Sequence, residues 1–263
     1  MAGTLSTGQG APAAAVSRPQ LELAVENADG VRLAAAVGAA RVELCAALAE
    51  TEGITPSIGM TEQACRVGLP VHVLVRPRPG DFAYSSEELD VIERDVAAAL
   101  AAGAAGVVVG VLRADGGPDI TALHRFVEAA RQSNPTAEIT FHRAFDAALA
   151  AGIDPADALA RLQRAGVHRV LTSGGSPDCA AGLGMLGRLV ELGRTHAPSV
   201  QIMAGGGVTL DLIPSLLGAG VHAVHTSARP RLGGGSGTDR VENADPALAA
   251  RLAAALTKEG LEP

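Results

Sequence analysis

The sequence predicts one α/β domain, a single (β/α)8 TIM-type barrel with a disordered N-terminal tail and a C-terminal extension. Two observations carry this prediction. Eight short apolar runs rich in Val, Ile and Leu recur along the chain, and helical patterns with recognisable ends lie between them. Eight strands and seven or eight helices in about 240 residues are typical of a (β/α)8 barrel. A doubly wound open sheet is the alternative.

The expected strands are short, continuous apolar segments, as buried strands of a parallel sheet are. They lie at residues 21–25, 41–45, 70–76, 106–110, 138–142, 168–172, 200–204 and 222–226. The helices between them carry end signals. Ser85 and Glu88 form a capping box before a helix that Gly103 ends, and Asp119 caps the next helix. Asp154, followed by a proline, marks the start of another.

The chain divides into three parts. Residues 1–19 have the Ala, Gly, Ser, Thr and Pro content of a disordered tail and lack the pattern of a signal peptide. The barrel is expected over residues 20–230. Residues 231–263 are expected to hold a glycine-rich segment and a C-terminal helix near 246–258 that packs on or near the barrel.

Composition excludes several classes of function. A net charge of -7 argues against nucleic acid and against anionic membranes, which bind basic patches. No apolar run has the length of a membrane span. Cys45, Cys65 and Cys179 are an odd number without paired spacing, as expected in the reducing cytoplasm. The only lysine is Lys258, in the C-terminal tail, so no barrel lysine is available for Schiff-base chemistry.

Polar residues gather where the apolar runs end, at 41–45, 75–82 and 140–146. Charge is costly inside strands, and TIM barrels carry their active sites at the carboxyl ends of their strands. Because side chains alternate along a strand, one set should face the barrel interior and converge at this end. Its members are Glu43, Cys45, Arg76, His142 and His225. The expected partner is a small molecule or a metal ion.

Three of these polar residues suggest acid–base chemistry. His142 has an ordinary pKa near neutrality, and Glu43 is a second candidate general base, or a metal ligand. Asp146 either orients His142 or caps the following helix. Arg76 is expected to bind an anionic group through its guanidinium fork. The structural alternative is that Arg76 only pairs with Glu43 or Asp81.

Two glycine-rich turns follow the sixth and seventh strands, and in TIM barrels the loops after strands seven and eight often bind phosphate. Tight turns alone would also explain the glycines. The residues expected to bind the substrate or its anionic group are Arg76, Arg143, Ser173, Gly174, Gly205, Gly206, His225 and Ser227.

The chain resembles the CutC family of copper-homeostasis proteins. The segments that carry the resemblance are RVELCAAL (41–48), ITPSIG (54–59), VRPRPGDFAYS (75–85), TFHRAFD (140–146), RVLTSGG (169–175), IMAGGGV (202–208) and VHTSA (224–228). The resemblance implies a TIM-type barrel, a cytoplasmic location, a homo-oligomer and a role in handling copper. Ala24 stands where the family commonly has a cysteine. Cu(I) prefers thiolates, so Cys45 is the expected copper ligand.

Three hypotheses about function follow. The first, from the resemblance, is copper homeostasis through Cu(I) binding at the barrel mouth. The second, from the residues, is an isomerase, epimerase or lyase type of enzyme that acts on a small anionic or phosphorylated metabolite. In it Glu43 and His142 move protons and Arg76 binds the anion. The third is a ligand-sensing scaffold without turnover.

Overall fold

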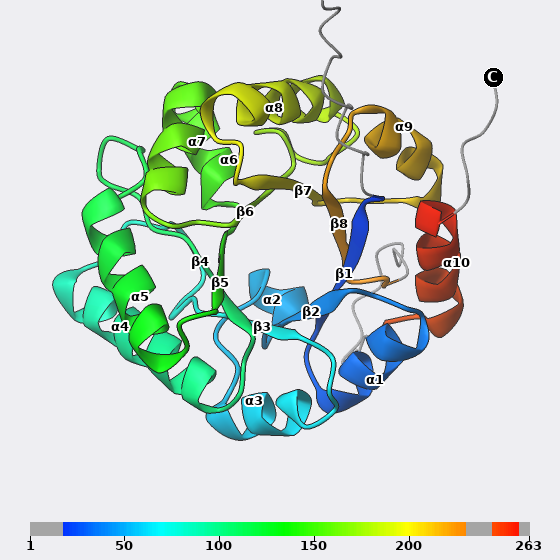
Figure 1. Ribbon diagram of the computed structural model, residues 1–263, viewed down its shortest axis with the longest axis horizontal. Helices are drawn as coiled ribbons and strands as arrows, with labels where there is room; N and C mark the ends of the chain where they lie inside the picture. Colours follow the sequence, from blue (N-terminus) through cyan, green and yellow to red (C-terminus); the bar gives the residue numbers. More distant parts are fainter. Residues whose placement is uncertain (1–17, 230–243, 258–263) are drawn as a thin grey trace, which may run out of the picture.

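Eight parallel strands close into one barrel in the computed structural model, which describes residues 18–229 and 244–257. The strands follow one another around the barrel in sequence order, and β8 pairs with β1 (Figure 1). This closure confirms the TIM-type barrel and excludes the open sheet. The strands are β1 Gln20–Val25, β2 Arg41–Leu44, β3 Val71–Leu74, β4 Gly106–Val109, β5 Glu138–Phe141, β6 Arg169–Thr172, β7 Gln201–Gly205 and β8 Ala223–Thr226.

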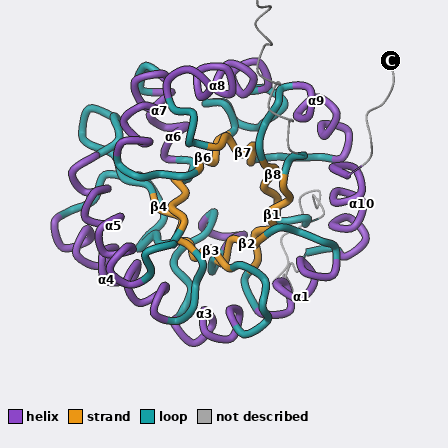
Figure 2. The backbone as a smooth tube through the Cα atoms, in the orientation of Figure 1, coloured by secondary structure: helices purple, strands orange, loops and turns teal. Residues whose placement is uncertain are grey.

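Helices form the outer ring around the strands, as Figure 2 shows. They are α1 Ala28–Ala36, α2 Leu48–Thr51, α3 Ile58–Cys65, α4 Ser86–Ala101, α5 Ile120–Ser133, α6 Ala144–Ala150, α7 Pro155–Arg164, α8 Leu183–His196, the 3-10 helix η1 Leu210–Leu212, α9 Ile213–Gly218 and α10 Pro246–Thr257. The short α2 differs, because it lies within the outline of the barrel rather than in the ring (Figure 1). Among the described helices, none has the length and apolar character needed to cross a bilayer.

The predicted elements match the observed ones closely. Every predicted strand is present with ends that agree to within two residues. The Ser85 and Glu88 capping box precedes α4, and the side chains of Asp119 and Asp154 cap α5 and α7. The predicted C-terminal helix is α10. The predictions made for residues 1–17, 230–243 and 258–263 lie outside the described residues.

The apolar core lies between the strands and the helices, not at the barrel centre. Alternate strand residues such as Leu23, Val42 and Val107 point outward, are fully buried and pack in one cluster with the helix side chains. Burying each such side chain contributes about 1.5–3 kcal/mol. The other strand face looks into the barrel, so the period-two pattern sends the remaining residues inward.

The middle of the barrel holds a buried ionic network instead of a purely apolar plug. Arg41 donates from Nε to Glu22, from Nη1 to Glu138 at 2.7 Å, and from Nη2 to Thr140 at 3.3 Å. Arg41 and Glu22 are 4% and 0% exposed. The planar guanidinium suits such a set of acceptors. Through it, β2 is tied to β1 and to β5 across the barrel.

Gly106→Ala should lower the free energy of unfolding by about 1–3 kcal/mol through overpacking. A Cβ at Gly106 would lie 2.4 Å from the Glu138 carbonyl oxygen and 2.7 Å from the His72 ring. Gly184→Ala is the matched control: it lies in α8 with nothing within 4 Å of the new Cβ. This control substitution should raise the free energy of unfolding by about 0.5–1 kcal/mol, because alanine favours a helix more than glycine does. Urea denaturation measures both, and equal effects would contradict the packing argument.

Candidate active site

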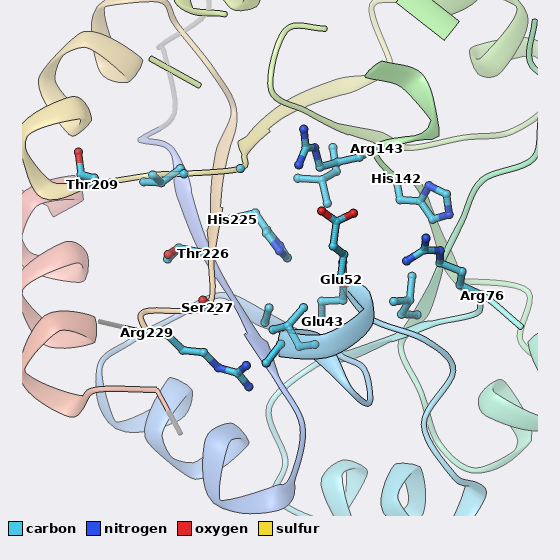
Figure 3. A pocket seen from close by; sticks show the side chains of 18 of the residues that line it. Glu43, Glu52, Arg76, His142, Arg143, Thr209, His225, Thr226, Ser227 and Arg229 are labelled. Carbon is cyan, nitrogen blue, oxygen red and sulfur yellow. The ribbon is translucent and has the colours of Figure 1, made fainter. Parts of the chain in front are cut away.

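A cavity of about 730 Å³ opens at the carboxyl ends of the strands, with its walls made by strand ends and the loops that follow (Figure 3). This is the end of the barrel at which the site is expected from the sequence. Seven of the predicted site residues line the cavity: Glu43, Arg76, His142, Arg143, Gly206, His225 and Ser227. Five do not line it: Cys45, Asp146, Ser173, Gly174 and Gly205.

Glu22, His225 and Glu43 form a cluster of titratable groups, of which His225 and Glu43 line the cavity. His225 Nδ1 lies 2.7 Å from Glu22 Oε1, and Glu43 Oε2 has no hydrogen-bond partner. Ligand atoms of all three lie within 4.8 Å of one another. Glu22 also pairs with Arg41, and this ion pair keeps Glu22 ionised.

The pKa values of the three groups follow from their neighbours. Burial alone would raise the pKa of Glu22, but Arg41 and the His225 hydrogen bond hold it far below its usual range. Burial would lower the pKa of His225, but the bond to Glu22 and the charge of Glu43 raise it. For Glu43, burial raises the pKa to about 7; His225 opposes this rise and Glu22 adds to it. Glu43 therefore changes its charge near neutral pH.

His142 differs from its expected role. Its Nδ1 accepts a hydrogen bond from the Ala144 backbone N–H at 3.0 Å, so a neutral ring must carry its proton on Nε2. Burial, and then the charge of Arg76, lower the pKa of His142 to about 3. The ring lies on Gly110, where a Cβ would be 2.1 Å away. The pKa near neutrality expected for His142 is found for Glu43 instead.

Asp146 has neither of the two predicted contacts. Its carboxylate accepts from the Thr172 hydroxyl at 2.5 Å, from the Ser173 backbone N–H at 3.1 Å and from Gly175 N at 2.9 Å. It also pairs with Arg143 Nε at 2.8 Å. None of its recorded bonds goes to His142 or to an N–H of α6. Asp146 therefore fixes the turn after β6 and the Arg143 guanidinium.

Arg143 lies on the cavity wall beside the glycine turn after β7. Its Nη2 donates to Ser173 Oγ at 3.0 Å, and a Cβ at Gly206 would lie 3.3 Å from the guanidinium. Ser173 and Gly174 lie behind this wall, and Gly174 has a φ of 77° with a Cβ position 2.5 Å from the Gly182 carbonyl. The tight turn by itself therefore explains why residue 174 is a glycine, without a role in ligand binding.

Arg76 pairs with neither Glu43 nor Asp81. Its Nη1 donates to the carbonyls of Thr51 and Gly53 at 2.8 and 2.9 Å. The partner of Asp81 is Arg78, at 3.0 Å. The structural alternative stated for Arg76 is therefore wrong.

Cys45 lies below the cavity in an apolar cluster with Leu74 and Val108. It is fully buried, and its Sγ contacts the Val25 carbonyl at 3.7 Å. Burial, and then the nearby acidic side chains, raise the pKa of the Cys45 thiol far above its usual range. Within the described residues, the one group with metal-ligand spacing is Glu22, Glu43 and His225. That set contains no sulfur, so it does not fit Cu(I).

Three further residues belong to the site although the sequence argument gave them no role. Glu22 lies two residues before Ala24, so the alternation of side chains along this strand already places both on the inward face. This alternation could have identified Glu22 as a site residue. Glu52 lines the cavity in a left-handed backbone conformation, with a φ of 62°. Arg229 lines it too and pairs with Glu26. No local pattern marks Glu52 or Arg229.

Glu43→Gln should change how stability depends on pH. The folded-state pKa of Glu43 is raised from 4.5 to about 7, so between these values the unfolded chain ionises first and folding loses stability as pH rises. The free energy of unfolding of the wild type, relative to Glu43→Gln, should therefore fall from pH 4.5 to 7. Urea denaturation across this range measures the difference. A difference that stays constant would refute the raised pKa.

The comparisons with known proteins agree with the predicted resemblance. The model of the CutC family matches residues 19–230. A family protein CutC of Agrobacterium fabrum is 42% identical over 197 residues, 75% of this chain and 74% of the relative. One of Rhizobium meliloti is 40% identical over 219 residues, 82% of this chain and 84% of the relative.

A solved structure from Streptococcus agalactiae, described as a candidate copper homeostasis protein CutC, superposes with a TM-score of 0.70. It is 30% identical and covers 80% of this chain and 98% of its own. An aldolase, QR15, superposes with a TM-score of 0.57 at 14% identity, which shows a shared fold alone. The family match spans nearly the whole barrel. The chain therefore belongs to the CutC family.

Proposed function

We propose that this protein is an enzyme that moves a proton on a small anionic metabolite bound at the barrel mouth. The single observation that supports it best is Glu43, a 5% exposed carboxyl in the cavity wall with an unpartnered Oε2. A buried carboxyl without a structural partner is costly. Its pKa of about 7 is suited to accepting and returning a proton at neutral pH.

His225 and Glu22 support this role of Glu43. His225, whose pKa the hydrogen bond to Glu22 and the charge of Glu43 raise against the effect of burial, places a second titratable group at the cavity wall near Glu43. Glu22 is closed off from solvent and keeps its charge through Arg41. Glu43 and His225 thus form an acid–base pair, and His142 is replaced in that role. This arrangement suits isomerase, epimerase or lyase chemistry without a Schiff base.

The anionic part of the metabolite is assigned to Arg143 and the turn after β7. Asp146 and Ser173 hold the Arg143 guanidinium, so its position does not depend on the ligand. Gly206 lets it approach the backbone, and Ser227 lines the same cavity. A guanidinium beside glycine backbone N–H groups suits a phosphate.

Deuterium exchange tests the proposed proton transfer. Small sugar phosphates and phosphorylated hydroxy acids are incubated with the protein in D2O, and mass spectrometry follows deuterium at carbon. We expect the wild type to exchange at least one compound. Glu43→Gln should slow that exchange by about 10²-fold or more, and Arg143→Ala should weaken binding.

Glu62→Gln is the matched control, because Glu62 is exposed on α3 and lies outside the cavity. It should exchange at the wild-type rate. Compounds that bind and never exchange would favour the ligand-sensing scaffold. Exchange that persists in Glu43→Gln would remove Glu43 as the base.

Copper homeostasis is the second candidate function, favoured by the description of the streptococcal relative. Cu(I) would be the cargo, and Cys45 the thiol expected to bind it. The donor chemistry opposes this, because the thiol is buried, hydrogen-bonded and held protonated by its raised pKa. Ala24 supplies no second sulfur. A cytoplasmic location agrees with three free cysteines, and homo-oligomerisation stays a prediction.

Cys45→Ser should leave Cu(I) binding unchanged. An anaerobic competition against a strong chromogenic Cu(I) chelator measures it for the wild type, for Cys45→Ser and for Cys65→Ser as the control on α3. We expect none of the three to compete, because the one group of described residues with metal-ligand spacing contains no sulfur. Stoichiometric binding by the wild type that Cys45→Ser alone abolishes would establish copper at the barrel mouth.

A further inference from the structure

Arg76 carries a buried positive charge without a counter-ion. It is 5% exposed, and its recorded partners are the backbone carbonyls of Thr51, Gly53 and Gly80, at 2.8 to 3.1 Å. No described carboxylate lies within ion-pair distance, and its Nε–H has no acceptor. Buried charges in proteins are normally paired. The missing partner is therefore an anion that enters the cavity Arg76 lines.

His142 supplies a second unused donor in the same place. Its Nδ1 is occupied by the Ala144 N–H, so the proton lies on Nε2, and Nε2 has no partner. The residue is 5% exposed and lines the cavity. With its proton on Nε2, the ring is a hydrogen-bond donor towards the cavity. It would bind an oxygen, not a cation.

Phe82 brings the two donors together. Its ring centroid lies 4.8 Å from that of His142, and the Arg76 Cζ lies 5.3 Å from the same ring. The three side chains come from the loop after β3 and from the end of β5. Gly110 leaves room for the imidazole, because a Cβ at this position would collide with the ring. Both donors are thus fixed before any ligand binds, which reduces the entropy cost of binding.

This place is separate from Arg143. Although His142 and Arg143 are neighbours in sequence, their side chains leave the backbone in different directions (Figure 3). The Arg143 side chain lies towards the turn after β7, beside Gly206. Arg76 and His142 lie on the β3 side. The cavity therefore offers cationic or donor groups at two positions.

We propose that Arg76 and His142 form a second anion site, which binds the carboxylate of a substrate whose phosphate lies at Arg143. This inference rests on the proposed function and narrows its substrate class to small phosphorylated acids. A carboxylate has two oxygens for two donors and supplies the charge that Arg76 lacks. Glu43, in the wall of the same cavity, then acts on the carbon chain of that substrate.

Paired phosphonates test the second site by calorimetry. Phosphonoacetate, 3-phosphonopropionate and 4-phosphonobutyrate are compared with methyl-, ethyl- and propylphosphonate, which lack the carboxylate. We expect at least one carboxylated probe to bind about 10-fold tighter than its partner, as a charge-assisted bond provides. Arg76→Gln should reduce that ratio to about one. Arg78→Gln, the matched control outside the cavity, should preserve it.

Because Arg76 also holds the loop carbonyls, a second measurement is made on the wild type. In ¹⁵N-histidine-labelled protein, the Nε2–H resonance of His142 should shift with the carboxylated probe and not with the alkylphosphonate. If alkylphosphonates bind through Arg143 and the carboxylate adds no affinity, the second site is wrong while the proposed function stands. If no probe binds at all, the Arg143 site fails as well.

Discussion

A single buried ion pair, between Arg41 and Glu22, sets the electrostatics of the whole barrel interior. Arg41 keeps Glu22 ionised in a place where burial alone would protonate it. Glu22 in turn bonds to His225 and, against the effect of burial, raises its pKa. Glu43, the next group towards the cavity, is buried and has no direct partner, so its pKa rises to about 7. Burial raises the pKa of Glu43 most, and the nearby charge of Glu22, which Arg41 keeps ionised, adds to that rise.

The opposite wall is built by a different principle. Here Asp146 is saturated by the Thr172 hydroxyl, backbone N–H groups and Arg143, so the turn after β6 and the guanidinium are fixed together. Such a network resists rearrangement because each lost bond would leave a buried polar group unpaired. The wall is thus rigid before a ligand arrives. Rigidity of this kind is what binding sites need to limit the entropy cost of association.

Orphaned groups, more than paired ones, indicate function in this molecule. Glu43 Oε2, Arg76 Nε and His142 Nε2 are all buried without partners, and all three residues line one cavity. In contrast, Cys45, the expected copper ligand, has a hydrogen-bond partner in the Val25 carbonyl and is enclosed by apolar side chains. Folded proteins rarely leave buried polar atoms unpaired. The two donors among them, Arg76 Nε and His142 Nε2, therefore argue for an oxygen-rich, anionic ligand rather than for a soft metal ion.

The sequence by itself determined the barrel, its strands and the end at which the site lies. The alternation of side chains along a strand and the capping residues of helices are local signals. They were enough to assign Glu43, Arg76, His142 and His225 to the barrel interior. They were also enough to find a strand such as β4 without knowing which strands lie beside it. Only the tertiary structure decided the roles. The pKa of Glu43 depends first on its burial and then on His225 and Glu22 from two other strands, and the lowered pKa of His142 depends on burial and then on Arg76. Asp146 became a positioning residue because the β6 turn folds onto it. Charge states and hydrogen-bond partners arise from residues distant in sequence, and no local pattern encodes them.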